Sequence, residues 1–258
     1  MKRLFLILFC GLIGLTAAAC IPLEPLTPLP TDTPPPPTQT PTATIVWFPP
    51  TPTITPLPTS TILAPTTQAT QASRGELLFE DQFSEAKRWT TGRTGSGTIT
   101  LENNELTLAV SRPGGYLSSL RSGTKLSDYY AEITASPTLC RGSDEYGLLL
   151  RTSSSGNFYR YSLTCDGQVR LDKLYQGKAS SPQGLTLSGQ VPRGSPSRSK
   201  LGIRTSGKDL NFYINDEFQF SVSDPSLISG GLGVFVRSNG DNPVTVNFSD
   251  LKVYQPGK

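Results

Sequence analysis

From residue 75 onward the sequence consists of short runs in which apolar and polar side chains alternate, and this pattern constrains the fold more than any other feature. Gly, Asn, Asp and Ser separate the runs at intervals of about 8 to 12 residues, as in strands joined by tight turns. No run has the periodicity of a long amphipathic helix. Strands are expected at Leu77–Phe83, Thr98–Leu101, Glu105–Val110, Tyr116–Ser119, Tyr129–Ala135, Tyr146–Thr152, Phe158–Thr164, Gln168–Tyr175, Lys200–Thr205, Asp209–Ile214, Glu217–Val222, Gly231–Ser238 and Val244–Tyr254. Thirteen strands are more than an immunoglobulin sandwich needs, and they predict an all-β domain, a two-sheet antiparallel jelly roll, over residues 74–258.

Two turns indicate how neighbouring strands pair. Asn215-Asp216 is typical of a two-residue hairpin, and Cys165–Gly167 of a three-residue loop with glycine in the left-handed conformation. The second loop places one set of pairs in the core and another on the outer face: Tyr161 with Leu171 and Leu163 with Val169 inside, Arg160 with Asp172 and Ser162 with Arg170 outside. A slip of one residue would bury the arginines, so the register is strongly specified.

Several segments of this domain together resemble a known superfamily. They are Phe79, Asp81, Phe83 and Trp89 at the start, Tyr146–Arg151, Phe158–Lys173 with Asp166-Gly167 at its turn, Leu201–Arg204, Leu210–Glu217, Gly230–Val236 and Val246–Leu251. The chain resembles the concanavalin A-like lectins and glucanases, and within them the laminin-G-like and 3-keto-disaccharide hydrolase-type modules of bacterial surface proteins. The resemblance covers residues 76–255 and implies architecture more than chemistry.

The N-terminus has the features of a secretory signal peptide over residues 1–19. Two basic residues precede an apolar run from Leu4 to Leu15, which is shorter than the ~20 residues of a spanning helix. The Ala-Ala-Ala-Cys ending at Cys20 resembles the lipobox of bacterial lipoproteins, although Ala17 stands where leucine is commoner. This resemblance implies a lipidated Cys20 and a protein that is exported and anchored on the outer side of a membrane. The alternative is an ordinary cut after Ala19 that leaves Cys20 free.

Residues 20–73 predict a disordered linker. From residue 21 this segment holds 15 of the 23 prolines, 15 threonines and only two charged residues, Glu24 and Asp32. It lacks the apolar side chains that a packed core needs, and its prolines favour extended polyproline II. We therefore expect a semi-rigid spacer between the anchor and the folded domain.

The composition excludes several kinds of function. The absence of histidine excludes a Ser-His-Asp triad and histidine-ligated zinc, and a net charge of +3 argues against nucleic acid as a partner.

No strand has the Glu-x-Asp-x-x-Glu pattern that glucanases of this superfamily usually carry. The adjacent pairs Asp144-Glu145 and Asp216-Glu217 are expected in solvated turns. Catalysis would need carboxylates from different strands to converge, as in a pairing of Glu132 with Asp172.

Two further features concern structure rather than ligands. Cys140 and Cys165 are the only cysteines of the domain, and export together with the predicted strand pairing favours a disulfide between them over two free thiols.

No cofactor is expected. Asp81 and Asp250 near the ends of the first and last strands are expected to cap turns, with a shared structural calcium as the alternative.

The candidate ligand site lies on the outer face of the central strands. Arg151, Phe158, Arg160, Arg170 and Asp172 are expected there, and an aromatic ring beside ions that bind hydroxyl groups suits a sugar. Galectin-like members of the superfamily carry their sugar sites on the concave sheet, which resembles this placement. The alternative is a solvated face on which Arg160 and Asp172 merely pair. Non-catalytic saccharide binding is thus the first hypothesis, a structural or protein-binding envelope module the second, and a glycosidase-like enzyme the third.

Overall fold

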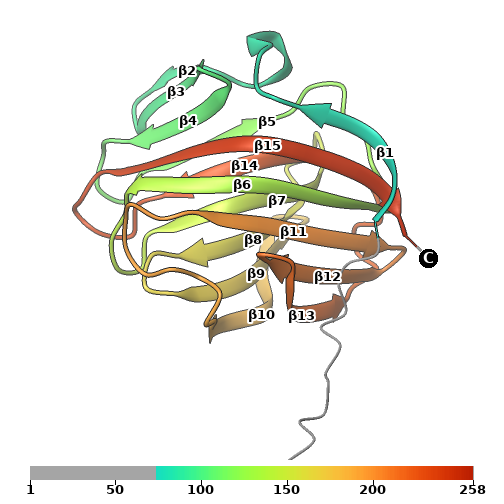
Figure 1. Cartoon of the computed structure of the whole chain (residues 1–258). Coiled ribbons are helices and arrows are strands. Elements are labelled where there is room, and N and C mark those ends of the chain that lie inside the picture. The colour runs from blue at the N-terminus through green and yellow to red at the C-terminus, as the bar shows by residue number, and fades with distance from the viewer. Residues whose placement is uncertain (1–73, 258) are drawn as a thin grey trace, which may run out of the picture. The chain divides into compact units, whose positions relative to one another are not determined.

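The computed structural model describes residues 74–257 (Figure 1). The predicted signal peptide (1–19), Cys20 and the predicted linker (20–73) lie outside the described residues. Fifteen strands and one short 3-10 helix, η1 (Ala86–Arg88), make up the regular structure of 74–257. Over this range no helix is long and apolar enough to cross a membrane.

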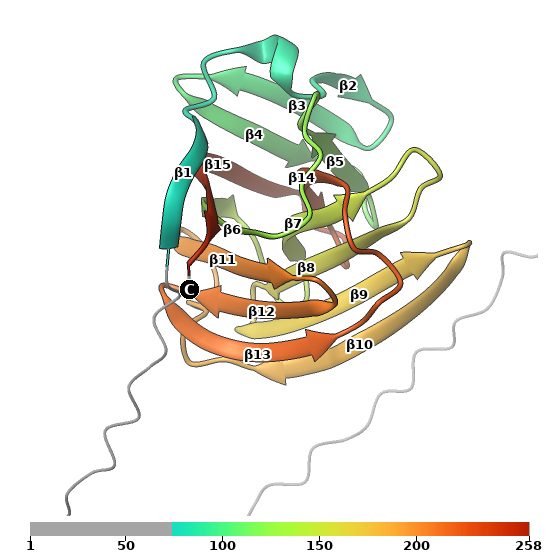
Figure 2. The ribbon, with the colours of Figure 1, turned by 90° about the vertical axis from the view of Figure 1, so that its right-hand side faces the viewer.

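The strands form two antiparallel sheets that pack face to face (Figures 1 and 2). The nine-stranded sheet has the order β13 (Glu217–Ser223), β12 (Asp209–Ile214), β11 (Ser199–Ser206), β6 (Tyr129–Leu139), β15 (Val244–Pro256), β4 (Glu105–Val110), β3 (Gly97–Glu102) and β2 (Gly92–Thr94), with β1 (Arg74–Asp81) paired to β15. The six-stranded sheet has the order β10 (Lys178–Leu187), β9 (Gln168–Tyr175), β8 (Phe158–Thr164), β7 (Glu145–Thr152), β14 (Gly231–Arg237) and β5 (Tyr116–Leu120). The predicted fold class is confirmed.

All thirteen predicted strands are present, and two strands were missed. One is the three-residue β2, and the other is β10, whose sequence contains Pro182 and Gly184. Proline and glycine argue against a central strand, but an edge strand with irregular pairing tolerates both. β10 is such an edge: its register with β9 shifts twice and most of its residues are exposed. It lies beside β13, the edge of the other sheet, where Ser188 just beyond β10 donates to Gln219 (2.7 Å; Figure 2).

The inner faces of the two sheets form one apolar core. The predicted pairing of β8 with β9 is confirmed, because Tyr161 faces Leu171 and Arg160 faces Asp172. Tyr161 is fully buried and packs on Phe212 of the opposite sheet, with ring centroids 4.7 Å apart. Aromatic contacts of this kind add to the free energy of burying each ring. Alternation along β8 therefore separates a core face from an outer face that is free to carry polar groups.

The predicted disulfide between Cys140 and Cys165 is confirmed. The Cα atoms are 5.8 Å apart, and both cysteines are buried. Cys140 directly follows β6 of the nine-stranded sheet, and Cys165 directly follows β8 of the six-stranded sheet. The bond therefore ties the two sheets together at one end of the sandwich.

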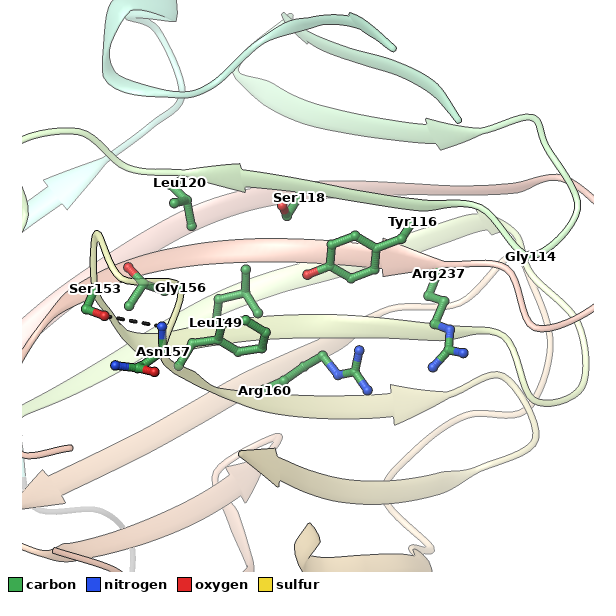
Figure 3. A pocket seen from close by; sticks show the side chains of 12 residues that line it. Gly114, Tyr116, Ser118, Leu120, Leu149, Ser153, Gly156, Asn157, Arg160 and Arg237 are labelled. Atoms are coloured by element: carbon green, nitrogen blue, oxygen red, sulfur yellow. Dashed lines mark hydrogen bonds between the residues drawn. The ribbon is translucent and has the colours of Figure 1, made fainter. Parts of the chain in front are cut away.

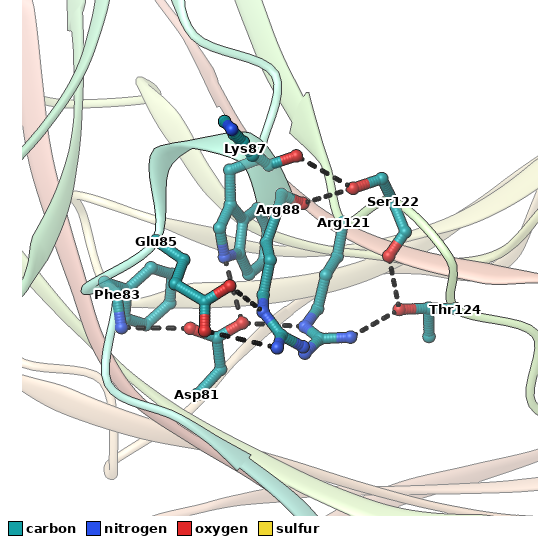
Figure 4. Close-up of polar contacts among 9 residues, drawn as sticks. Asp81, Phe83, Glu85, Lys87, Arg88, Arg121, Ser122 and Thr124 are labelled. Carbon is teal, nitrogen blue, oxygen red and sulfur yellow. Dashed lines mark hydrogen bonds and ion pairs between the residues drawn. The ribbon is translucent and has the colours of Figure 1, made fainter.

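A buried acidic residue holds the first strand in place (Figure 4). Asp81 Oδ1 accepts a hydrogen bond from the backbone N–H of Phe83 (2.9 Å), which has a φ of 56°. Its Oδ2 accepts from Trp89 Nε1 (3.2 Å) and from Arg121 Nε (2.7 Å), and Arg121 also stacks over the Phe79 ring. One structural cluster thus contains the four residues Phe79, Asp81, Phe83 and Trp89, and it fixes the end of β1 against the neighbouring segments.

The acidic residues proposed to share calcium have other partners. Both oxygens of Asp81 are engaged in the turn and the ion pair just described. Asp250 is exposed and lies 3.3 Å from Arg198. Asp81 therefore stabilises a turn, as the sequence predicts.

Candidate functional site

The outer face of the six-stranded sheet carries a pocket of about 570 Å³ (Figure 3). Its side chains come from β5, β7, β8 and β14, and from the turn that joins β7 to β8. Ser153 and Asn157 close this turn, since the Asn157 N–H donates to Ser153 Oγ (3.2 Å) and the Ser153 N–H to the Asn157 carbonyl (2.9 Å). The turn therefore holds Phe158, the first residue of β8, at the pocket wall.

Much of the pocket surface is apolar. Leu149 points outward because its neighbours Leu148 and Leu150 point into the core. Half-buried Phe158 and exposed Leu120 add to this surface, and the ring of Tyr116 stacks on buried Phe235 of β14 with centroids 5.9 Å apart. Partial burial raises the pKa of Tyr116, with nearby Arg160 acting in the opposite direction. The phenol therefore keeps its proton and can donate to a ligand.

Next to the pocket, four charged side chains form a network across three strands. Asp172 on β9 lies 2.6 Å from Arg160 and 2.9 Å from Arg170, and accepts a hydrogen bond from Ser181 (2.6 Å). Arg170 also lies 2.9 Å from Glu145 on β7. The predicted Arg160–Asp172 pair is thus present within a larger network. Two guanidinium groups face two carboxylates, so its charges cancel.

Glu145 is the member of this network that sequence reasoning misplaced. Asp144 and Glu145 were expected in a solvated turn, but each is only 3% exposed. Asp144 accepts from the backbone N–H groups of Arg141 (3.1 Å) and Asn239 (2.9 Å), while Glu145 begins β7. Counting back from Leu149 in steps of two would have placed Glu145 on the outer face. Asp216 does lie in an exposed turn, as predicted.

The prediction that Arg151 faces outward is wrong. Its side chain is fully buried, and it donates to the carbonyl oxygens of Leu227 (2.6 Å), Gly207 (2.8 Å) and Ser127 (3.2 Å). Strict alternation would place Arg151 beside Leu149, but a bulge in the β7–β14 pairing breaks the alternation there. The backbone of Arg151 has a φ of 49°.

A glycine makes this bulge sterically feasible. A Cβ atom at Gly230 would lie 2.4 Å from the carbonyl carbon of Arg151, which no side chain tolerates. The bulge thus turns the guanidinium inward, where it bridges three loops at one end of the sandwich. Arg151 belongs to the framework of the fold and not to the pocket.

The suggested convergence of Glu132 and Asp172 is also wrong. Glu132 lies on β6 of the nine-stranded sheet and pairs with Arg74 (2.8 Å). Asp172 lies on β9 of the six-stranded sheet. The two carboxylates share no cleft, since each faces away from the core on a different sheet.

The pocket brings together residues that the sequence does not group. Phe158 and Arg160 line it, whereas Arg170 and Asp172 lie beside it in the charged network. Tyr116, Ser118 and Leu120 of β5 and Arg237 of β14 were not predicted. Their inclusion depends on β14 lying next to β7 and on β5 lying next to β14, and this strand order is not sequential.

Comparison with solved structures places the domain among β-sandwich proteins. The carbohydrate binding module CBM66 from Bacillus subtilis is similar with a TM-score of 0.50 and 19% identity, over 65% of this chain and 96% of that one. A B. subtilis protein of unknown function with a galectin-like fold gives 0.54 and 14%, over 70% and 97%. The catalytic domain of an endo-1,3-beta-glucanase (laminarinase) from Thermotoga petrophila gives 0.51 and 12%, over 72% and 100%. This chain has their fold. No protein-family model matches it, and no curated protein matches it in sequence.

Proposed function

We propose that this protein binds a saccharide, without cleaving it, in the pocket on the outer face of the six-stranded sheet. The observation that carries the proposal is the pocket itself, because a purely structural module needs only a flat outer face. A sugar ring offers an apolar face and a rim of hydroxyl groups. Phe158 and Leu149 suit the apolar face, and Tyr116, Ser118 and Asn157 suit the hydroxyl groups.

The similar structures support this proposal through their fold. One of them is named as a carbohydrate-binding module and another as a glucanase. Sandwich proteins of this architecture therefore include both binders and enzymes, so the choice between them must come from the residues of this chain.

One observation favours a glycosidase-like enzyme as the second candidate. Glu145 and Asp172 contact the same Arg170 nitrogen, so these carboxylates are neighbours, as glycoside hydrolysis requires. However, one carboxyl group of such a pair must carry a proton, and arginines occupy an oxygen of each group here. Neither residue lines the pocket. The arrangement therefore favours binding over turnover.

We also propose that the domain is displayed outside the cell. In this proposal the signal peptide 1–19 directs export, lipidated Cys20 anchors the chain to a membrane, and the linker 20–73 holds the domain away from the surface. The support is the sequence pattern of residues 1–73.

Binding of the full-length protein, purified in detergent, to a broad glycan array tests the saccharide proposal. Phe158→Ala should weaken binding to any recognised glycan by roughly 1 to 3 kcal/mol through the loss of ring contacts. Phe218→Ala is the matched control, because Phe218 is an exposed phenylalanine (46%) on β13 of the other sheet. Absence of binding across the array contradicts the proposal, and release of new reducing ends from a bound glycan supports the enzyme instead.

A further inference from the structure

Arg237 differs from the other arginines on the outer face of the six-stranded sheet. It is the last residue of β14, is half-buried and lines the pocket. Within residues 74–257 no carboxylate lies within 4 Å of its guanidinium group, although Glu145 faces it across the strands. The Glu145 carboxylate contacts Arg170 instead (2.9 Å). The charge of Arg237 is therefore not balanced by a close partner in the described part of the chain.

The pocket lining is rich in donors and poor in charged acceptors. It includes two arginines, Arg160 and Arg237, and no carboxylate. A guanidinium group only donates hydrogen bonds, and the phenol of Tyr116 keeps its proton. Arg160 is already neutralised from outside the pocket by Asp172 (2.6 Å). Arg237 is thus the source of the unbalanced positive charge.

The two arginines share one end of the pocket. In Figure 3 the guanidinium groups of Arg160 and Arg237 lie on the same side of the pocket, whereas Leu120 and Leu149 lie toward the opposite side. The hydroxyl group of Tyr116 points into the space between these ends. A ligand that fills the pocket would therefore place an apolar face at one end and a hydrogen-bond acceptor at the other.

We infer that the saccharide carries an acidic substituent, a carboxylate or a sulfate ester, which Arg237 binds while the sugar ring contacts the apolar end. The inference rests on the proposed function and specifies its ligand class. A planar guanidinium group forms two parallel hydrogen bonds with either kind of anion, and such bonds are stronger than those to neutral hydroxyl groups. A neutral sugar would leave the charge of Arg237 without an anion.

The test compares matched glycans on full-length protein in detergent. Each glycan is presented as a neutral oligosaccharide, as its uronate and as its sulfate ester, so that the array also distinguishes the two acids. At least one acidic form should bind about tenfold more tightly than its neutral form, a ratio typical of a hydrogen bond to a charged group. Salt should reduce this preference.

Substitutions assign the preference to Arg237. Arg237→Gln should bind the acidic and neutral forms alike, and Arg237→Lys should retain part of the preference because it keeps the charge. Arg93→Gln is the matched control, because Arg93 is exposed on β2 of the other sheet and makes no ion pair within 74–257. The control should keep the full preference.

Each contrary outcome has a distinct meaning. If the wild-type protein binds neutral and acidic forms equally and Phe158→Ala still weakens binding, the acidic ligand class is wrong and the saccharide proposal stands. An acidic preference that persists in folded Arg237→Gln refutes the role of Arg237. If no form binds, the proposed function fails, and with it this inference.

Discussion

Replacement of Arg151 by alanine is expected to destabilise the domain by about 3 kcal/mol. The buried guanidinium group donates to three backbone carbonyls, those of Ser127, Gly207 and Leu227, at 3.2, 2.8 and 2.6 Å. A hydrogen bond from a charged group contributes ~1.5 to 3 kcal/mol to stability. The sum over three such bonds is an upper limit for the loss of unfolding free energy, and it lies well above the expected value. Part of that loss is recovered, because the mutant no longer buries a charge that has no carboxylate partner within residues 74–257.

Backbone strain should not alter this comparison. Arginine and alanine both have a Cβ atom, so the left-handed conformation at residue 151 costs each of them a similar amount. Arg151→Lys should fall between wild type and alanine, because one ammonium group cannot reach all three carbonyls. The free energy of unfolding is measured by urea titration, with the fluorescence of buried Trp89 among the signals.

The result also distinguishes a framework residue from a ligand residue. A surface arginine on the outer face would change stability by less than about 0.5 kcal/mol when replaced. If Arg151→Ala changes stability this little and abolishes glycan binding, the structural role is refuted and the original prediction is restored. Arg160→Ala, in the charged network beside the pocket, provides the comparison for binding.

The anchor at Cys20, the disulfide and the Asp224–Lys173 ion pair can each be tested by one substitution. Cys20→Ser should move the protein from the detergent phase to the aqueous phase, because the acyl chains would be lost, and unchanged partitioning would contradict lipidation. Mass spectrometry of the non-reduced protein should find Cys140 and Cys165 in linked peptides, and Cys140→Ser should cost roughly 3 kcal/mol of stability for a loop with a sequence separation of 25; two free thiols would refute the bond. Burial alone would raise the pKa of Asp224, but hydrogen bonds from Lys173 and Ser226 lower it from 3.8 to about 2. Folding therefore favours ionised Asp224, and its contribution is complete above pH ~4 and is lost as the pH falls toward 2. Asp224→Asn should flatten the decline in unfolding free energy over this range, and an unchanged slope would show that the ion pair with Lys173 contributes nothing.

The parts of the fold that sequence predicted well are those in which one local signal suffices. The β8–β9 hairpin has a turn with Gly167, which has a φ of 92°, and alternation on both strands, so its register follows directly. β10 lacks both kinds of signal because it is an exposed edge with Pro182 and Gly184. Edge strands need no apolar face, so their sequences resemble those of loops.

The errors at the candidate site have a different cause. Glu145 is the first residue of β7 and Arg151 the last but one, and alternation alone places both on the outer face. The bulge that turns Arg151 inward depends on close approach of Gly230, a residue of another loop. For Glu145 the adjacent acidic pair with Asp144 predicts a solvated turn, and this signal competes with alternation. A contact between distant segments therefore decides the position of Arg151, whereas that of Glu145 follows from alternation along β7 itself.

The pocket itself depends on strand order more than on any strand's own sequence. β7 has β8 on one side and β14 on the other, and β14 in turn brings β5 alongside.

Arg160 belongs both to the pocket lining and to the ion pairs beside it, so a substitution there changes ligand contacts and the charged network together. Arg237 lines the pocket and forms no ion pair within residues 74–257. Binding measurements on Arg237 variants can therefore report on the ligand, whereas Arg160 variants report on the ligand and on the network at once.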